Sequence, residues 1–375
     1  MSRRTTAPAA LLSRTVLRGV VLLALIAGLW AAAIPSQAQE PIAPWVDVFV
    51  RRDPALGTAQ IYFVDALTGL STVVPVDNGD EFTLVGGYVM YRKPQNGVIM
   101  RAYPDGRIEP HPFIQSSADR RVTEWVTSPD ARSIAWVQVD ANGVSHASIA
   151  QSGGGSLREI PIESPAPPTE IAPVALTDGM TRFYFDAAYD PGAGTNGPYA
   201  AYTEVHEYNL ANAAFRTLAE EPGCACAAAV TPDGALFVRL ELAQAAGPYN
   251  VRVFDLRSDL SYTITAPGLP YPYAGSLVVN AAGTLAAYSI ASAPPAEEGD
   301  VQQYALMFVD IAAQQQVLIL PPGTTDFRAV RFIDDGSALL VIDTGTGSTY
   351  KLNLNNGELV RVSDFTYLGT ITLPA

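Results

Sequence analysis

The sequence is poor in lysine, histidine and cysteine. Of its 375 residues two are lysine, three are histidine and two are cysteine, and acidic residues outnumber basic ones by 37 to 23. The resulting net charge of −14 repels phosphate backbones and anionic lipid, so no nucleic-acid partner is expected. Acidity otherwise indicates only a well-solvated surface.

The sequence also lacks the motifs that usually carry chemistry. It has no Gly-x-Ser-x-Gly elbow, and its glycine-rich pieces lack the strand-to-helix setting of a phosphate loop. His111, His146 and His206 are too scattered for a metal or triad site, and we expect surface or edge positions for them. Cys224 and Cys226 are too close for an unstrained disulfide, so two thiols or a labile disulfide are expected. No catalytic residue, metal or cofactor is predicted.

The N-terminus has the pattern of an export signal. Four arginines precede an uncharged apolar run from Val20 to Ile34, and Ser36-Gln37-Ala38 suits cleavage after Ala38. The run of 15 residues is short for a bilayer span, which needs about 20. We therefore expect a signal peptide over residues 1–38 and an extracellular, cell-envelope or periplasmic protein. The alternative is an uncleaved segment that anchors the chain, which is the only membrane contact expected.

Beyond residue 38 the chain shows no helical periodicity and instead repeats a β-unit. Short alternating runs are separated by Gly, Pro, Asn and Asp, as in Val230 to Val238, where Pro232-Asp233-Gly234 turns one strand into the next. A second turn motif, which follows an apolar strand and often ends in Asp or Asn, occurs seven times from Asp65 to Asn353. These positions span 288 residues in six steps of about 48. A four-stranded antiparallel unit of 40 to 50 residues is typical of a propeller blade.

The repeat predicts one all-β domain over residues 39–375. Seven blades of four strands account for almost the whole length, with six or eight as alternatives. The first unit, Trp45 to Val76, has room for three strands only, and Tyr367 to Leu373 remains as an extra strand at the C-terminus. We therefore expect this C-terminal strand to become the innermost strand of blade 1 and to close the ring.

The turn motifs resemble those of the TolB-like propellers, which are built from WD-like repeats. The resemblance is carried by Ser128-Pro129-Asp130, Thr231-Pro232-Asp233-Gly234 and the stretch Ile61 to Gly69. About half of the repeats keep the motif, and Ala131 replaces the turn glycine in one of them. The resemblance implies residence in the envelope or outside the cell and contacts with proteins, but no shared reaction.

The long connections all fall on one face of the predicted ring and carry Pro-Tyr pairs. Stiff loops with tyrosines lose little entropy on binding and offer apolar area with a hydrogen-bonding tip. These loops predict a binding surface for a protein, peptide or glycan, with tyrosines that alternatively only cover the blade edges. The candidate binding residues are Tyr199, Tyr249, Tyr271, Tyr273, Glu297, Glu298 and Asp300.

The sequence therefore favours a monomeric, exported, non-enzymatic propeller that serves as a binding or scaffold module. One alternative is a propeller enzyme, with lyase, glycosidase or quinone-linked chemistry in the central funnel. That alternative requires acid–base carboxylates, histidines or metal ligands at the ends of the inner strands, and Asp178, Asp233 and Asp335 lie in turns instead. The other alternative is a membrane-anchored sensory ectodomain.

Overall fold

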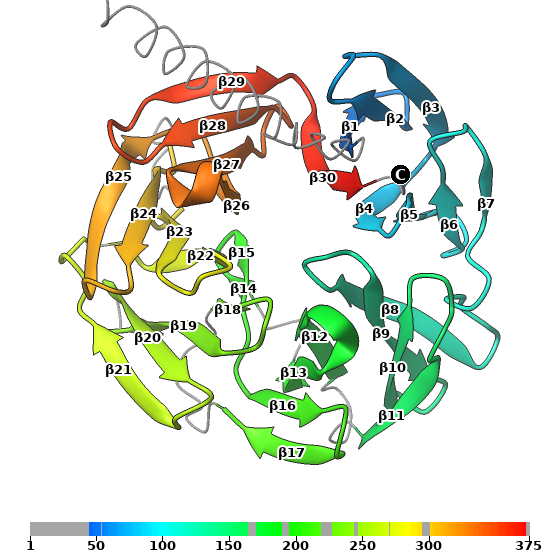
Figure 1. Cartoon of the computed structure of the whole chain (residues 1–375), viewed down its shortest axis with the longest axis horizontal. Helices are drawn as coiled ribbons and strands as arrows, with labels where there is room; N and C mark the ends of the chain where they lie inside the picture. The colour runs from blue at the N-terminus through cyan, green and yellow to red at the C-terminus, as the bar shows by residue number, and fades with distance from the viewer. Residues whose placement is uncertain are drawn as a thin grey trace, which may run out of the picture. The chain divides into compact units, whose positions relative to one another are not determined.

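The computed structural model describes residues 45–53, 55–163, 170–189, 195–218, 227–243, 247–269, 271–294 and 301–372. These residues form seven four-stranded antiparallel sheets, arranged as blades around a central axis (Figure 1). The prediction of a seven-bladed all-β propeller is therefore confirmed. The predicted signal peptide, residues 1–38, lies outside the described residues. Within the described ranges no helix has the length and hydrophobicity needed to cross a membrane.

In blades 2 to 4 the first strand of the blade is the innermost one. Blade 2 contains β4 (Asp80–Val85), β5 (Tyr88–Arg92), β6 (Ile99–Ala102) and β7 (Ile108–Pro110). Blade 3 contains β8 (Arg120–Thr127), β9 (Ser133–Asp140), β10 (Ser145–Gln151) and β11 (Arg158–Glu163). Blade 4 contains β12 (Glu170–Leu176), β13 (Arg182–Tyr189), β16 (Val205–Asn209) and β17 (Ala214–Thr217). A small hairpin, β14 (Thr195–Asn196) and β15 (Tyr199–Ala200), is inserted between β13 and β16.

Blades 5 to 7 follow the same order. Blade 5 contains β18 (Ala228–Val230), β19 (Leu236–Leu242), β20 (Tyr249–Asp255) and β21 (Leu260–Ile264). Blade 6 contains β22 (Tyr273–Val279), β23 (Leu285–Ala291), β24 (Tyr304–Asp310) and β25 (Gln315–Gly323). Blade 7 contains β26 (Phe327–Ile333), β27 (Ala338–Asp343), β28 (Thr349–Asn353) and β29 (Leu359–Ser363).

Blade 1 joins the two ends of the described chain. Its strands are, from the rim to the axis, β3 (Ser71–Asp77), β2 (Thr58–Asp65), β1 (Trp45–Asp53) and β30 (Thr366–Thr372). The C-terminal strand β30 pairs antiparallel with β1, from Trp45 opposite Thr372 to Val50 opposite Thr366. The predicted closure by the C-terminal strand is confirmed.

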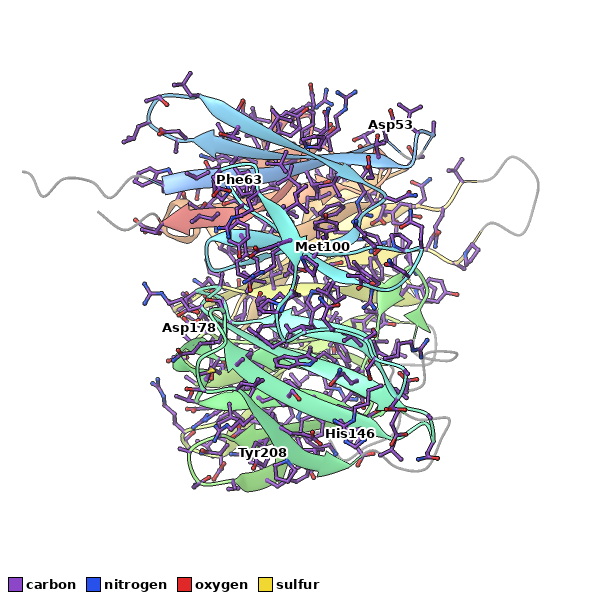
Figure 2. The ribbon with its side chains drawn as sticks, turned by 90° about the vertical axis from the view of Figure 1, so that its right-hand side faces the viewer. Asp53, Phe63, Met100, His146, Asp178 and Tyr208 are labelled. Carbon is purple, nitrogen blue, oxygen red and sulfur yellow. The ribbon has the colours of Figure 1, made fainter. Side chains whose placement is uncertain are left out.

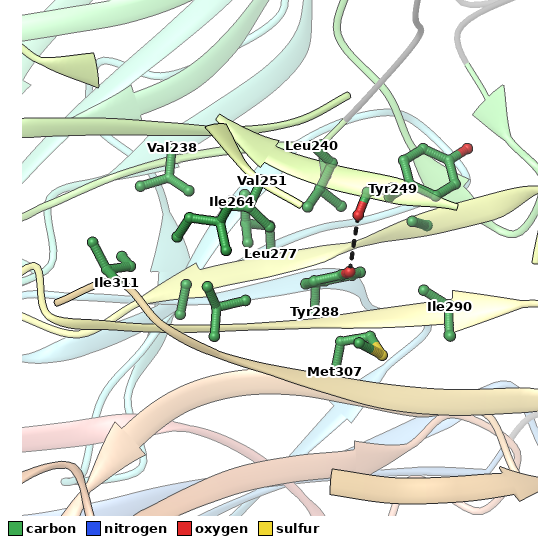
Figure 3. Close-up of a cluster of buried hydrophobic side chains, with 14 of the residues drawn as sticks. Val238, Leu240, Tyr249, Val251, Ile264, Leu277, Tyr288, Ile290, Met307 and Ile311 are labelled. Atoms are coloured by element: carbon green, nitrogen blue, oxygen red, sulfur yellow. Dashed lines mark hydrogen bonds between the residues drawn. The ribbon is translucent and has the colours of Figure 1, made fainter. Parts of the chain in front are cut away.

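The hydrophobic core lies between adjacent blades, because each sheet has two faces to cover. In blade 5, Val238 and Leu240 of β19 point towards blade 6, where they meet Tyr288 and Met307 (Figure 3). Phe237, the residue before Val238, points the other way and packs with residues of blade 4. Each buried side chain of this size contributes about 1.5–3 kcal/mol. Stacking of the blades is therefore what makes the small sheets stable.

The two faces of the ring differ. The short-turn face carries the turns between the first and second strands of the blades, including the 3₁₀ turns η1 (Asp178–Met180) and η2 (Asp334–Gly336). The long-loop face carries the turns between the second and third strands and the links between blades. Figure 2 shows Asp178 on the first face and Asp53 and His146 towards the second. On the short-turn face the Asp130 amide donates to Asp178 Oδ1 at 2.9 Å, so the turns of blades 3 and 4 brace each other.

Candidate functional site

The inner strands are interrupted at corresponding positions. In six of the seven blades the pairing between the innermost strand and its neighbour shifts register, and only the three-residue strand β18 pairs without a shift. Glu81 and Ser276 adopt left-handed backbone conformations within these interruptions, with φ of 52° and 51°. A β-bulge re-aims side chains and is common next to active sites. The side chains at these interruptions, around the axis, are therefore candidates for a functional site.

Three carboxylates and one arginine gather on the inner part of blades 2 to 4. Glu81 lies on β4, Glu124 on β8 and Glu170 on β12, and Arg92 ends β5. Arg92 donates from Nε to Glu81 Oε2 at 2.9 Å, and its Nη atoms donate to the backbone carbonyls of Val122 and Thr123 at 2.7 and 2.8 Å. The register shift between Val122 and Glu124 lies at these carbonyls. Arg92 therefore holds the bulge that orients Glu124. We call Glu81, Arg92, Glu124 and Glu170 the carboxylate cluster.

Glu124 has the electrostatic character of an acid–base catalyst. Burial raises its pKa to about 7, the negative charges of Glu170 and Glu81 act in the same direction, and Arg92 opposes them. Among the described residues the Glu124 carboxylate has no hydrogen bond or salt bridge. A carboxylic acid that is half protonated near neutral pH can both donate and accept a proton, which general acid–base catalysis requires.

A tryptophan of blade 3 packs against blade 2 beside Arg92. The Trp125 indole donates from Nε1 to Thr83 Oγ1 at 2.9 Å, and the Arg92 guanidinium lies 4.9 Å from a Trp125 ring centroid. Trp125 thus faces blade 2, while Val126, the next residue, packs with the core between blades 3 and 4. Alternation along β8 then directs Glu124 towards blade 4, where Glu170 begins the inner strand.

Two cavities open on the short-turn side and share Arg331. One, of about 780 Å³, reaches from Arg331 and Tyr367 to the Thr127–Arg132 turn of blade 3. The other, of about 670 Å³, lies between blades 7 and 1 and is lined by Trp45, Asp47 and Arg331 among others. The Arg331 guanidinium is held 5.2 Å from the Tyr367 ring centroid. Neither of these two cavities is lined by a residue of the carboxylate cluster.

The predicted binding tyrosines are packed at the long-loop face. Tyr199 and Tyr249 are 1% and 3% exposed, whereas Tyr271 and Tyr273 are half-buried. The β14–β15 hairpin of blade 4 reaches blade 6, because a Cβ at Gly197 would lie 2.4 Å from the Tyr273 ring. The structure thus brings the segment that carries Tyr199 into contact with the segment that carries Tyr273.

The second tyrosine pair lies in blades 5 and 6. Tyr249 donates its hydroxyl to the Pro272 carbonyl at 2.6 Å, and a Cβ at Gly247 would lie 2.4 Å from the carbonyl oxygen of Tyr271. Glu297, Glu298, Asp300, Cys224 and Cys226 lie outside the described residues. That the tyrosines bind a ligand stays a prediction.

The histidines are not all surface or edge residues, contrary to the expectation from sequence. His111 is 1% exposed, and burial together with the charge of Arg101 lowers its pKa to about 3. The Ile114 amide donates to His111 Nδ1 at 3.1 Å, so Nε2 carries the proton and donates to the Tyr88 hydroxyl at 3.0 Å. The neighbours that bury His111 come from across blade 2, which is why local sequence did not reveal it. Among the residues that the structure describes, no three His, Cys, Asp or Glu side chains are grouped to hold a metal ion.

Sequence reasoning missed the carboxylate cluster. A signal was nevertheless present, because Arg120-Arg121-Val122-Thr123-Glu124 places charge in a segment that the repeat assigns to an innermost strand. An inner strand is largely covered, so a carboxylate there is unusual. Comparing inner-strand positions across the repeats would have singled out Glu81, Glu124 and Glu170.

No family model and no curated protein sequence matches the chain. Its structure is similar to an oligogalacturonate lyase from Vibrio parahaemolyticus, with 12% identity, a TM-score of 0.53 and coverage of 81% of this chain and 82% of that one. It is also similar to a periplasmic gluconolactonase from Pseudomonas aeruginosa, with 16% identity, a TM-score of 0.50 and coverage of 88% and 100%. A prolyl endopeptidase gives a TM-score of 0.59 at 12% identity, with 97% of this chain covering 56% of that chain. At these identities the likeness shows the propeller fold.

These findings correct the functional preference drawn from sequence. A non-enzymatic binding or scaffold module was favoured because no inner-strand carboxylate had been recognised. The structure places Glu124 and its neighbours there, and the three similar proteins just described carry the names of enzymes. The enzymatic alternative is therefore better supported than the binding or scaffold module.

Proposed function

We propose that the chain is an exported propeller enzyme that breaks a C–O bond of a sugar acid or sugar lactone, with Glu124 as its general acid–base. The proposal is carried by the Glu124 carboxyl. It is partly buried, it has two other carboxylates nearby, and its own pKa is raised to about 7. Such perturbed groups cluster at functional sites.

The two similar sugar-directed enzymes motivate the substrate class. Lactone hydrolysis adds water and breaks the bond between the acyl carbon and the ring oxygen. Elimination in a uronide removes the proton next to the carboxylate and breaks the C–O bond to the neighbouring sugar. In both reactions ionised Glu124 first takes up the proton that is removed, from the attacking water or from the carbon, and the resulting Glu124 carboxylic acid then returns it to the departing oxygen. General acid–base catalysis of this kind contributes roughly 10²–10⁴-fold to a rate.

Export is part of the proposal. It rests on the basic and apolar N-terminal segment with its small residues before Gln39, and the similar gluconolactonase is described as periplasmic. Membership of the TolB-like family stays a prediction from the turn motifs around Pro129 and Pro232.

The test is an assay of the purified protein against aldonolactones and oligouronides, with Glu124→Gln as the diagnostic variant. Glutamine preserves size but cannot donate or accept a proton in this role, so kcat should fall by about 10²–10⁴-fold. Glu358→Gln, on an exposed turn of blade 7, is the matched control and should leave turnover unchanged. Equal turnover by Glu124→Gln and the parent protein would refute the assignment.

A further inference from the structure

A third cavity opens on the long-loop face between blades 7 and 1. Its volume is about 790 Å³, within the range of small-ligand sites. Three arginines line it, Arg51 and Arg52 at the end of β1 and Arg361 on β29, with Asp364 as the acidic residue among the lining side chains. Further lining comes from the β27–β28 turn and from Phe82 and Phe365. We call this cavity the basic pocket.

The guanidiniums of Arg51 and Arg52 are free to bind a ligand. Neither has a hydrogen bond or salt bridge within the described ranges of the chain, and both side chains are exposed. Arg361 differs, because it pairs with Asp364 at 2.7 Å and donates to Ser348 Oγ at 2.8 Å. Two unpaired arginines at one cavity are unexpected in a chain that has 37 acidic residues to accept them.

Aromatic rings hold both arginines in place. Arg51 lies 6.0 Å from the Phe365 ring centroid, and Phe365 stacks on Tyr62 with centroids 4.4 Å apart. Arg52 lies 5.1 Å from the Phe82 ring centroid. Phe82 in turn stacks on Tyr91 at 5.5 Å. A guanidinium that rests on a ring keeps its donors exposed and loses less entropy when a ligand binds.

The other polar groups of the pocket are already used within the protein. The hydroxyls of Thr344, Thr346 and Thr366 donate to Asp326, Asp343 and the Gly347 carbonyl respectively. The amides of Gly345 and Thr346 donate to Asp343 Oδ1. The carboxylates near the pocket are thus engaged by the turn, and the two guanidiniums are its available donors.

We propose that the basic pocket binds an anionic group of an oligosaccharide, a carboxylate or a sulfate, and so acts as a substrate subsite of the proposed enzyme. This inference rests on the proposed function for its sugar ligand. Two guanidinium forks suit planar or tetrahedral oxyanions. Phe82, which lines the pocket, follows Glu81 of the carboxylate cluster on β4. The substrate would be a charged oligomer of at least two units.

The proposal is tested by calorimetric titration of the Glu124→Gln protein, which keeps the ligand intact. Three oligosaccharides of equal length are compared: an oligogalacturonate with carboxylates, a sulfated galactan oligomer and a neutral maltooligosaccharide. At least one anionic oligomer should bind saturably, and the neutral one should not. Because the protein carries a net charge of −14, unspecific attraction of a polyanion is not expected. The stronger anionic ligand identifies carboxylate or sulfate as the group recognised.

The variant Arg51→Gln/Arg52→Gln should weaken anionic binding by at least about tenfold, since charge-assisted hydrogen bonds are lost. Arg107→Gln is the matched control, because Arg107 also lies on an aromatic ring, 4.0 Å from the Tyr103 centroid, but outside the pocket. The proposed anion site would be refuted if the double variant bound the anionic oligomer as tightly as its parent does. It would also be refuted if the neutral oligomer bound as tightly as the anionic ones. Turnover that survives Glu124→Gln, together with arginine-dependent binding, refutes the catalytic proposal and leaves the pocket standing.

Discussion

Arg92 donates from Nε to Glu81 Oε2 at 2.9 Å, and the same guanidinium bonds the backbone of the neighbouring blade. One side chain therefore ties the left-handed residue of the β4 bulge to the bulge of β8. The Arg92 side chain is 13% exposed, so its hydrogen bonds to the Val122 and Thr123 carbonyls are partly shielded from water, whereas Glu81 is 48% exposed. The geometry of the carboxylate cluster depends on this relationship between two blades.

Replacement of Arg92 should therefore affect both stability and catalysis. Arg92→Leu leaves the Val122 and Thr123 carbonyls and Glu81 without their partner and should cost about 2–4 kcal/mol of unfolding free energy. Loss of its positive charge should also raise the pKa of Glu124 further. Arg92→Lys keeps the positive charge but lacks the planar guanidinium. It should therefore leave the pKa of Glu124 nearly unchanged but still lower the free energy of unfolding. Thermal unfolding and the pH dependence of kcat measure the two effects, and identical behaviour of the two variants would contradict this division.

Glu124 should make the protein less stable as the pH rises. Its pKa is about 7 in the folded chain against 4.5 for an unperturbed glutamic acid, so the folded state binds more protons between these values. Stability is therefore full below pH 4.5 and declines through pH 7, by about 3 kcal/mol for this one group. Glu124→Gln should flatten this decline and be more stable than the parent at pH 8. Urea unfolding at several pH values checks the slope, and parallel curves for the two proteins would exclude the shift.

His111 should act in the opposite direction. Its pKa falls from 6.5 to about 3 on folding, so the unfolded state binds more protons between pH 6.5 and 3. Stability from neutral His111 is full above pH 6.5 and is lost as the pH falls, at up to about 1.4 kcal/mol per pH unit. His111→Gln cannot be protonated and should unfold less steeply with acid, even if its stability at pH 8 is lower. NMR titration of the imidazole gives the pKa directly, and a value near 6.5 would refute the effect.

The sequence was sufficient to predict the architecture because each blade repeats local turn chemistry. The spacing of about 48 residues predicts seven blades, and the shortage of one strand in Trp45 to Val76 predicts closure by the C-terminus. The residues next to Glu124 in the sequence do not show that its pKa is raised. Its pKa depends on Glu81, Glu170 and Arg92, which belong to three other strands, and on a bulge that only the paired strands reveal. Likewise, the sequence does not show that Arg51 is unpaired, because the fold determines which acidic residues lie near it.

The C-terminal strand β30 closes the ring and packs tightly against blade 2 at Gly369. Gly369 lies opposite Val48 on β1, has φ of 146°, and a Cβ there would meet Leu84 Cδ2 of blade 2 at 2.7 Å. Gly369→Val should therefore strain the backbone and push blades 1 and 2 apart, at a cost of about 2–4 kcal/mol. Deletion of residues 364–375 removes all of β30, leaves the inner edge of β1 without its partner, and should unfold the protein. Gly323→Ala, in blade 6 with open space around its Cα, is the control and should leave the melting temperature unchanged. A folded deletion variant with the parent's melting temperature would show that blade 1 is stable without β30 and that the ring does not depend on this closure.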